Sequence, residues 1–185
     1  EQLCKNLRFS DDNLSKISNR YHSITKRINT DYWETSSDSA HSLYVGSYGR
    51  DTEIFTSDID MLVQLPYSTY EKFNAYTSNG QSALLQEVKK VIEKTYSVTN
   101  LKADGQIISV PFSDGINFEV LPAFINKDGN SYTFANSNNG GSWKVTNPRA
   151  EIAEIQSMNN QCNSNLKRLC KMSRAWRNKN DVDIS

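Results

Sequence analysis

Two aspartates, Asp58 and Asp60, interrupt the apolar run SDIDMLVQLP at residues 57–66, and no other feature of the chain restricts its fold as strongly. Side chains two positions apart in a strand point to the same face, so a strand here places two carboxylates side by side. Such close anions repel each other unless a cation lies between them. Oxygen ligands without nearby His or Cys favour Mg²⁺, with Mn²⁺ as the alternative, over zinc. Taken alone, the pair is more typical of two solvent-facing aspartates at a strand end.

A turn upstream and an acid downstream add weight to the metal interpretation. Gly46 and Ser47 follow the apolar run HSLYV. There a glycine permits close approach, and N–H groups with a hydroxyl can hold phosphate oxygens. Arg50 offers a cation for phosphate, although a simple turn and a surface arginine explain these residues too. Glu119 lies within the apolar segment INFEVLPAF, where an unpaired carboxylate is costly. Two-metal phosphoryl transfer uses such a third acid.

Hydrophobic spacing predicts the elements of the first two thirds of the chain. Apolar residues at steps of three and four predict helices over 14–32 and 84–96. Alternating or β-branched runs predict strands in HSLYVG, SDIDMLVQLP, YSVTNL, GQIISVPF and INFEVLPAF. The turn signal SDG joins the last two strands. These segments predict a sheet that contains a meander.

The last third changes composition. Residues 126–147 are rich in Gly, Asn and Ser and predict a long structured loop, in which Trp143 either orders the loop over the site or packs as a core aromatic. Asn147 and Pro148 form a capping pair that predicts a helix start. A second helix places Leu166, Leu169, Cys170 and Trp176 on one face and Lys171 and Arg174 on its other side. The basic side either binds phosphate or is merely solvated.

Length and charge limit the possible classes. The chain has 185 residues, which suits one domain, or one domain with a fragment of a second. Its 21 basic and 21 acidic residues create no overall field of the kind that general nucleic-acid binders carry. Three cysteines, at positions 4, 162 and 170, and two histidines argue against zinc and predict reduced thiols and a cytoplasmic location. No apolar run predicts a signal peptide or a membrane partner.

Three strings in this order, GSYGRDT, SDIDMLV and FEVLPAF, resemble the nucleotidyltransferase core shared by oligoadenylate synthetases, cyclic GMP–AMP synthase and the bacterial CD-NTases of SMODS type. With GGSWKVTNP and the basic helix, the resemblance covers roughly residues 40–180. It implies an α+β, polymerase beta-like fold, with a mixed, mostly antiparallel sheet and helices packed on one face. It also implies a catalytic core with an N-terminal helix at 1–147. Residues 148–185 would then be the start of a helical C-terminal lobe, of which this chain holds only a part.

The resemblance further implies a magnesium-dependent synthase that joins nucleoside triphosphates into a cyclic di- or trinucleotide messenger of antiphage defence and releases pyrophosphate. A downstream receptor of that messenger is expected without direct contact, and a nucleic-acid activator is not expected. The alternatives are a nucleotidyltransferase that modifies a protein, small molecule or RNA end, and a non-catalytic nucleotide-binding module. Glu119 departs from the aspartate of many members. The implied catalytic and metal-binding residues are Asp58, Asp60 and Glu119, and the implied nucleotide-binding residues are Gly46, Ser47, Arg50, Ser57, Lys171 and Arg174.

Overall fold

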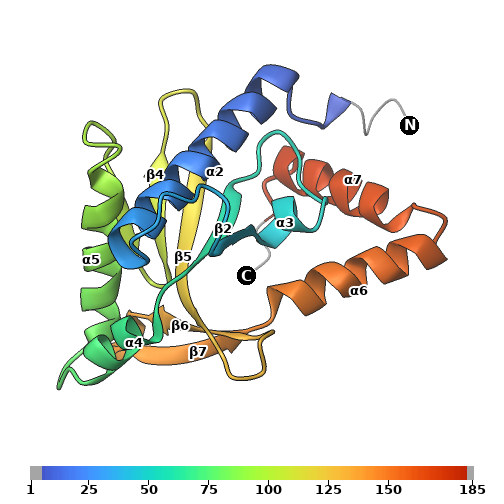
Figure 1. Ribbon diagram of the computed structural model, residues 1–185. Helices are drawn as coiled ribbons and strands as arrows, with labels where there is room; N and C mark the ends of the chain where they lie inside the picture. The colour runs from blue at the N-terminus through green and yellow to red at the C-terminus, as the bar shows by residue number, and fades with distance from the viewer. Residues whose placement is uncertain (1–5, 183–185) are drawn as a thin grey trace.

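A seven-stranded mixed sheet forms the centre of the computed structural model, which describes residues 6–182 (Figure 1). The strand order is β1-β2-β5-β4-β3, and β6 and β7 continue from the far part of β5. Only β2 and β5 run parallel, and the other pairs are antiparallel. The predicted α+β fold with a mostly antiparallel sheet is thus confirmed. The strands are β1 (Ser42–Tyr44), β2 (Ile59–Gln64), β3 (Lys102–Asp104), β4 (Ile107–Pro111), β5 (Asn117–Ile125), β6 (Tyr132–Asn136) and β7 (Ser142–Thr146).

The predicted helices begin at side-chain caps. Ser10 accepts a hydrogen bond from the Asn13 N–H at 3.2 Å, and Asn147 accepts one from the Ala150 N–H at 3.0 Å. Within residues 6–182, no helix combines the length and apolar character that a membrane crossing requires. The helices are α2 (Asp11–Tyr32), α3 (Gly46–Gly49), α4 (Tyr67–Asn74), α5 (Gly80–Glu93), α6 (Pro148–Gln161) and α7 (Leu166–Lys179).

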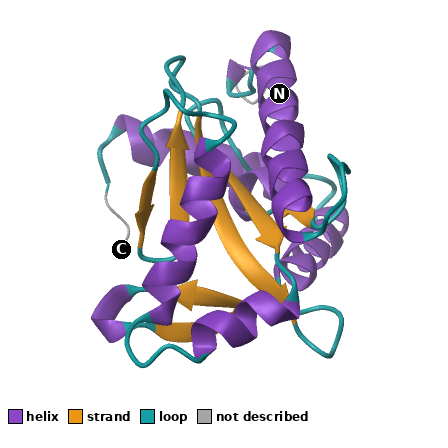
Figure 2. Cartoon of the chain, turned by 60° about the vertical axis from the view of Figure 1, so that its left-hand side comes forward, coloured by secondary structure: helices purple, strands orange, loops and turns teal. Residues whose placement is uncertain are grey.

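Helices α2 and α5 lie on one side of the sheet, as Figures 1 and 2 show together. Alternate residues of β2, namely Ile59, Met61 and Val63, are fully buried in the core that these helices share with the sheet. Because side chains alternate along a strand, Asp60 must point to the opposite face. That opposite face carries a smaller apolar cluster around Leu62.

Two local predictions were wrong. The segment YSVTNL, residues 96–101, forms turns, and β3 begins only at Lys102. Residues 126–147 are not a long loop but contain the hairpin of β6 and β7, which pairs with the end of β5 through Ala123 and Phe134. The Gly- and Asn-rich residues form the turn between β6 and β7. An available strand edge on β5 makes this segment a sheet extension, and composition does not reveal that edge.

Helix α4 was not predicted, although Tyr67, Tyr70 and Phe73 recur at steps of three. Helix α6 begins at the predicted position. Whether residues 148–185 open a separate lobe stays a prediction.

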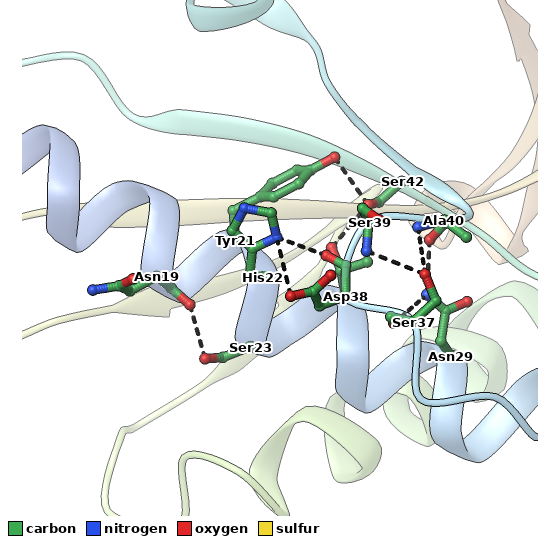
Figure 3. A network of polar contacts seen from close by, with 11 residues as sticks. Asn19, Tyr21, His22, Ser23, Asn29, Ser37, Asp38, Ser39, Ala40 and Ser42 are labelled. Carbon is green, nitrogen blue, oxygen red and sulfur yellow. Dashed lines mark hydrogen bonds and ion pairs between the residues drawn. The ribbon is translucent and has the colours of Figure 1, made fainter.

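The link between α2 and β1 is held by a polar network (Figure 3). The Asn29 amide donates to two backbone carbonyls of this link, at 2.9 and 2.7 Å. The Ser42 hydroxyl donates to the Tyr21 hydroxyl at 2.9 Å. His22 donates from Nδ1 to the carbonyl oxygen of Asp38 at 2.8 Å. This network fixes the entry into β1, and therefore the position of the turn that follows β1.

Candidate active site

Parallel pairing of β2 and β5 brings Asp60 directly beside Glu119. Their strand neighbours Ile59 and Phe118 point into the helix-covered core, so both acids face the other way. The two carboxyl groups are hydrogen-bonded to each other. Asp58 lies just before β2, and its charge acts on both acids. The structure thus brings together the three acids that the sequence singled out.

The pKa values of Glu119 and Asp60 are both raised. Burial, the charges of Asp58 and Asp60 and the hydrogen bond to Asp60 raise the pKa of Glu119 from 4.5 to about 7. Burial also raises the pKa of Asp60, although the backbone N–H of Ser47 donates to it and opposes the rise. Two carboxyl groups can form a hydrogen bond only if one of them is protonated. We therefore treat Asp60 and Glu119 as one coupled pair, whose two carboxyl groups titrate together.

The turn after β1 is built around the Asp60 carboxylate. Gly46 has a φ of 57°, and a Cβ at this position would lie 1.9 Å from Asp60 Oδ2. Next in the chain, Ser47 is buried and donates its backbone N–H to the same carboxylate. The Thr52 N–H donates to the Ser47 carbonyl at 2.9 Å and closes the turn. The expected Gly-Ser turn is therefore the single helical turn α3, and its contact is with an acid of the cluster.

A small polar pocket of about 150 Å³ opens beside the acids. The predicted residues Ser47, Ser57 and Arg174 line it together with Asp58 and Asp60. Sequence reasoning missed three further lining residues, although one of them lies one helical turn after Arg174 on α7 and carries the same charge. The missed residues are Thr56, Arg177 and Asn178.

Arg50 and Lys171 have protein partners in this structure. Arg50 donates to Glu151 on α6 at 2.8 Å and lines an adjacent cavity of about 660 Å³. Lys171 is buried, and its Nζ lies 2.8 Å from an Asp51 oxygen and 3.3 Å from a Glu53 oxygen. Neither of them lines the small polar pocket.

Asn117 is a further residue of the site that the sequence did not reveal. It lies two positions before Glu119 in β5 and donates from Nδ2 to Asp58 Oδ1 at 3.2 Å. Its own Oδ1 accepts a hydrogen bond from the Ser109 hydroxyl of β4 at 2.9 Å. The signal was present in the strand period, since Asn117 and Glu119 share a face. Asn117 orients Asp58, which is otherwise exposed.

Trp143 does not cover the acids. Its ring packs against Tyr70 and Phe124, with ring centroids 4.8 and 5.8 Å away, and its Nε1 donates to Asn74 at 3.0 Å. The interpretation as a packed aromatic is the one that the structure supports.

The acid cluster has the donor chemistry of a site for a hard divalent cation. All of its ligands are oxygens, which Mg²⁺ and Mn²⁺ prefer. Among the described residues 6–182, however, no three His, Cys, Asp or Glu side chains are arranged to hold an ion as they lie. Asp58 accepts from Asn117, and Asp60 is engaged with Glu119. Loading a cation therefore requires the carboxylates to turn toward the ion.

The raised pKa of Glu119 predicts an unusual dependence of stability on pH in the metal-free protein. Because the folded pKa of Glu119 lies above the ordinary value, the folded state holds more protons than the unfolded chain between pH 4.5 and about 7. The free energy of unfolding should therefore fall as the pH rises through this window. Glu119→Gln removes the penalty and should stabilise the protein at pH 8 by about 1–2 kcal/mol, a value reduced for solvent screening.

Urea unfolding with a chelator at pH 5 and pH 8 measures this difference. Glu71→Gln, at an exposed position of α4, is the matched control and should leave the profile unchanged. A Glu119→Gln variant that is less stable than the wild type at pH 8 would contradict the assigned direction.

Comparison with known proteins adds independent findings. The family model described as Second Messenger Oligonucleotide or Dinucleotide Synthetase domain (SMODS) matches residues 1–159. A cyclic AMP-AMP-AMP synthase of Acinetobacter sp. (strain ATCC 27244 / 9458) is 24% identical over 151 residues, which cover 82% of this chain and 43% of that protein. The chain therefore spans less than half the length of this curated relative.

Solved structures share the fold at low sequence identity. DncV of Vibrio cholerae, in its apo form, aligns with a TM-score of 0.68 at 15% identity, over 98% of this chain and 65% of that one. The CD-NTase CdnG of Bradyrhizobium diazoefficiens, solved in complex with GTP, aligns with a TM-score of 0.63 at 15% identity, over 82% of this chain and 44% of that one. These alignments confirm the predicted nucleotidyltransferase fold.

Proposed function

The chain belongs to the SMODS family of second messenger oligonucleotide or dinucleotide synthetases, and from this membership we propose that it joins nucleoside triphosphates into a cyclic di- or trinucleotide. One observation carries the proposal beyond the family. Asp58, Asp60 and Glu119 gather on the open face of the sheet, beside a pocket that Arg174 also lines. Nucleotidyl transfer needs acids that bind a divalent cation and a basic side chain that binds phosphate.

In the proposed reaction a sugar hydroxyl attacks the α-phosphate of a nucleoside triphosphate, and pyrophosphate leaves. Asp58, Asp60 and Glu119 would hold magnesium, or manganese, which supplies positive charge for the phosphate oxygens when bound. Glu119, which lies directly beside Asp60 in the sheet, is the group that we assign to receive the proton of the attacking hydroxyl. A second transfer within the linear product would close the ring.

The remaining predicted residues bind and orient the triphosphate in this proposal. Arg174 offers its guanidinium to the phosphates, and Ser47 and Ser57 offer hydroxyls from the pocket wall. Gly46 keeps the turn close to Asp60. Arg50 borders the adjacent cavity and would reach a ligand there only by leaving Glu151.

The biological setting belongs to the same proposal. The relative from Acinetobacter is a cyclic AMP-AMP-AMP synthase, and CdnG was solved with GTP, which supports nucleoside triphosphates as substrates here. We place the protein in the cytoplasm, since Cys162 and Cys170 are free thiols. Cys4 lies outside the described residues. A role in antiphage defence would act through a separate receptor for the product.

The purified protein should convert nucleoside triphosphates, in the presence of magnesium, into a phosphatase-resistant cyclic product and pyrophosphate. Incubation with all four triphosphates, followed by chromatography and a pyrophosphate assay, measures both products. Asp60→Asn, which keeps the size of the side chain, is the matched control and should yield neither. Transfer of labelled nucleotide to a protein, small molecule or RNA end would favour the first alternative. Nucleotide binding without any turnover would favour the non-catalytic module.

A further inference from the structure

Lys171 is a buried cation of helix α7. Its side chain is 8% exposed, and within the described residues 6–182 it is the one Lys, Arg, Asp or Glu among the buried residues. The ammonium contacts Asp51 at 2.8 Å and Glu53 at 3.3 Å. A buried ammonium is tolerated only where opposite charges compensate it. Lys171 therefore binds helix α7 firmly to the segment 51–53.

Two successive hydrogen bonds connect segment 51–53 to the acid cluster. Thr52, between the two acidic partners, is 3% exposed and donates its backbone N–H to the Ser47 carbonyl at 2.9 Å. The Ser47 N–H in turn donates to the Asp60 carboxylate. The position of α7 is thus tied, through segment 51–53 and the α3 turn, to an acid of the cluster.

A second contact ties the end of α7 to the same loop. The Asn178 amide donates to the Thr56 hydroxyl at 3.0 Å. Positions 171, 174 and 178 follow each other at steps of three and four, so they share one face of the helix. Arg174 therefore lies between two anchors.

Arg174 itself has no such partner. Within residues 6–182 it makes no hydrogen bond or ion pair, and it lines the small pocket together with Asp58 and Asp60. Burial and the neighbouring charges of Arg177 and Arg50 lower its pKa, so these cations repel one another. An arrangement of this kind suits an anion, and it persists only if the helix is held from outside the pocket.

We propose that Lys171 is a positioning residue: through Asp51 and Glu53 it fixes α7 so that Arg174 faces the polyphosphate, and it does not bind phosphate itself. This inference rests on the proposed function, because it requires a polyphosphate ligand in the pocket. In this proposal Lys171, the buried cation of α7, pairs with acids of the protein, and Arg174, which has no such partner, binds the ligand.

Inorganic triphosphate with magnesium is the probe, because its binding does not depend on which base the protein selects. Lys171→Met leaves Glu53 without its cation and Asp51 with Lys167 alone, 3.6 Å away, and titration calorimetry should show a loss of affinity of about 10-fold or more. Combining it with Asp51→Asn and Glu53→Gln removes the uncompensated acids. This triple variant should recover binding to within about threefold of the wild type, since a neutral cluster can replace a buried ion pair.

A second arm asks whether Lys171 acts through Arg174. If it does, adding Lys171→Met to Arg174→Ala should lower the affinity by less than about twofold further, instead of about 10-fold, because coupled residues are not additive. The triple variant keeps the test decisive even if Lys171→Met alone fails to fold.

Failure to recover binding in the folded triple variant, or a full additive loss on top of Arg174→Ala, would overturn the inference and leave the proposed function standing. Those results would mean that Lys171 contacts the phosphates directly. A wild-type protein that binds no triphosphate and releases no pyrophosphate would overturn both. The two failures are therefore distinguishable.

Discussion

Asp60→Asn is expected to abolish nucleotidyl transfer while the protein stays at least as stable as the wild type. Asp60 is central in the cluster, because it interacts with Glu119 and the Ser47 N–H and leaves no room for a side chain at position 46. Asparagine keeps the shape and an acceptor for Ser47, but it removes one of the negative charges that a divalent cation requires. Losing several kcal/mol of charge stabilisation should lower turnover by at least about 100-fold. Asp58→Asn should have the same effect on turnover.

Stability should move in the other direction. The metal-free cluster contains three acids that repel one another, and neutralising one of them relieves this repulsion. Pyrophosphate release measures turnover, and urea unfolding with a chelator measures stability. Asp12→Asn, on the exposed first turn of α2, is the matched control and should change neither quantity appreciably. Turnover above about one tenth of the wild-type rate in Asp60→Asn would contradict metal-assisted chemistry at this cluster.

Gly46→Ala is expected to damage both activity and stability. The added Cβ would meet Asp60 Oδ2 at 1.9 Å, and the backbone φ of 57° is unfavourable for alanine. The carboxylate must then move away from Glu119, or the turn must unwind and release the Ser47 N–H. We expect a loss of turnover of at least about 100-fold and a stability loss of about 1–3 kcal/mol.

Gly129→Ala separates the two causes. Gly129 also has a positive φ, 69°, but nothing lies within 4 Å of an added Cβ. This variant carries the backbone cost alone, about 1 kcal/mol, and should keep wild-type turnover. If Gly46→Ala and Gly129→Ala have the same turnover, the close approach of position 46 to Asp60 does not affect catalysis. Steady-state pyrophosphate release and urea unfolding of both variants decide the matter.

Local periodicity was enough to predict much of the fold. The strand around Asp60 and the helix at 14–32 follow from spacings of two and of three to four, which depend only on neighbours in the chain. The same logic predicted that Asp58, Asp60 and Glu119 would converge once the family resemblance ordered the segments. Asn117 was open to this reasoning too, because it is two residues from Glu119 in one strand.

Only the tertiary structure decided which distant groups meet. The register that sets Asp60 beside Glu119, the pairing of β6 with β5, and the ion pairs of Lys171 with Asp51 and Glu53 join residues far apart in the chain. A composition rich in Gly and Asn fits a loop and a hairpin turn equally well. The hairpin forms because β6 can pair with the end of β5. Likewise, the sequence alone does not distinguish one basic residue of a helix face from another. Burial and the nearest carboxylates show that Lys171 is paired within the protein, whereas Arg174 is available to bind a ligand.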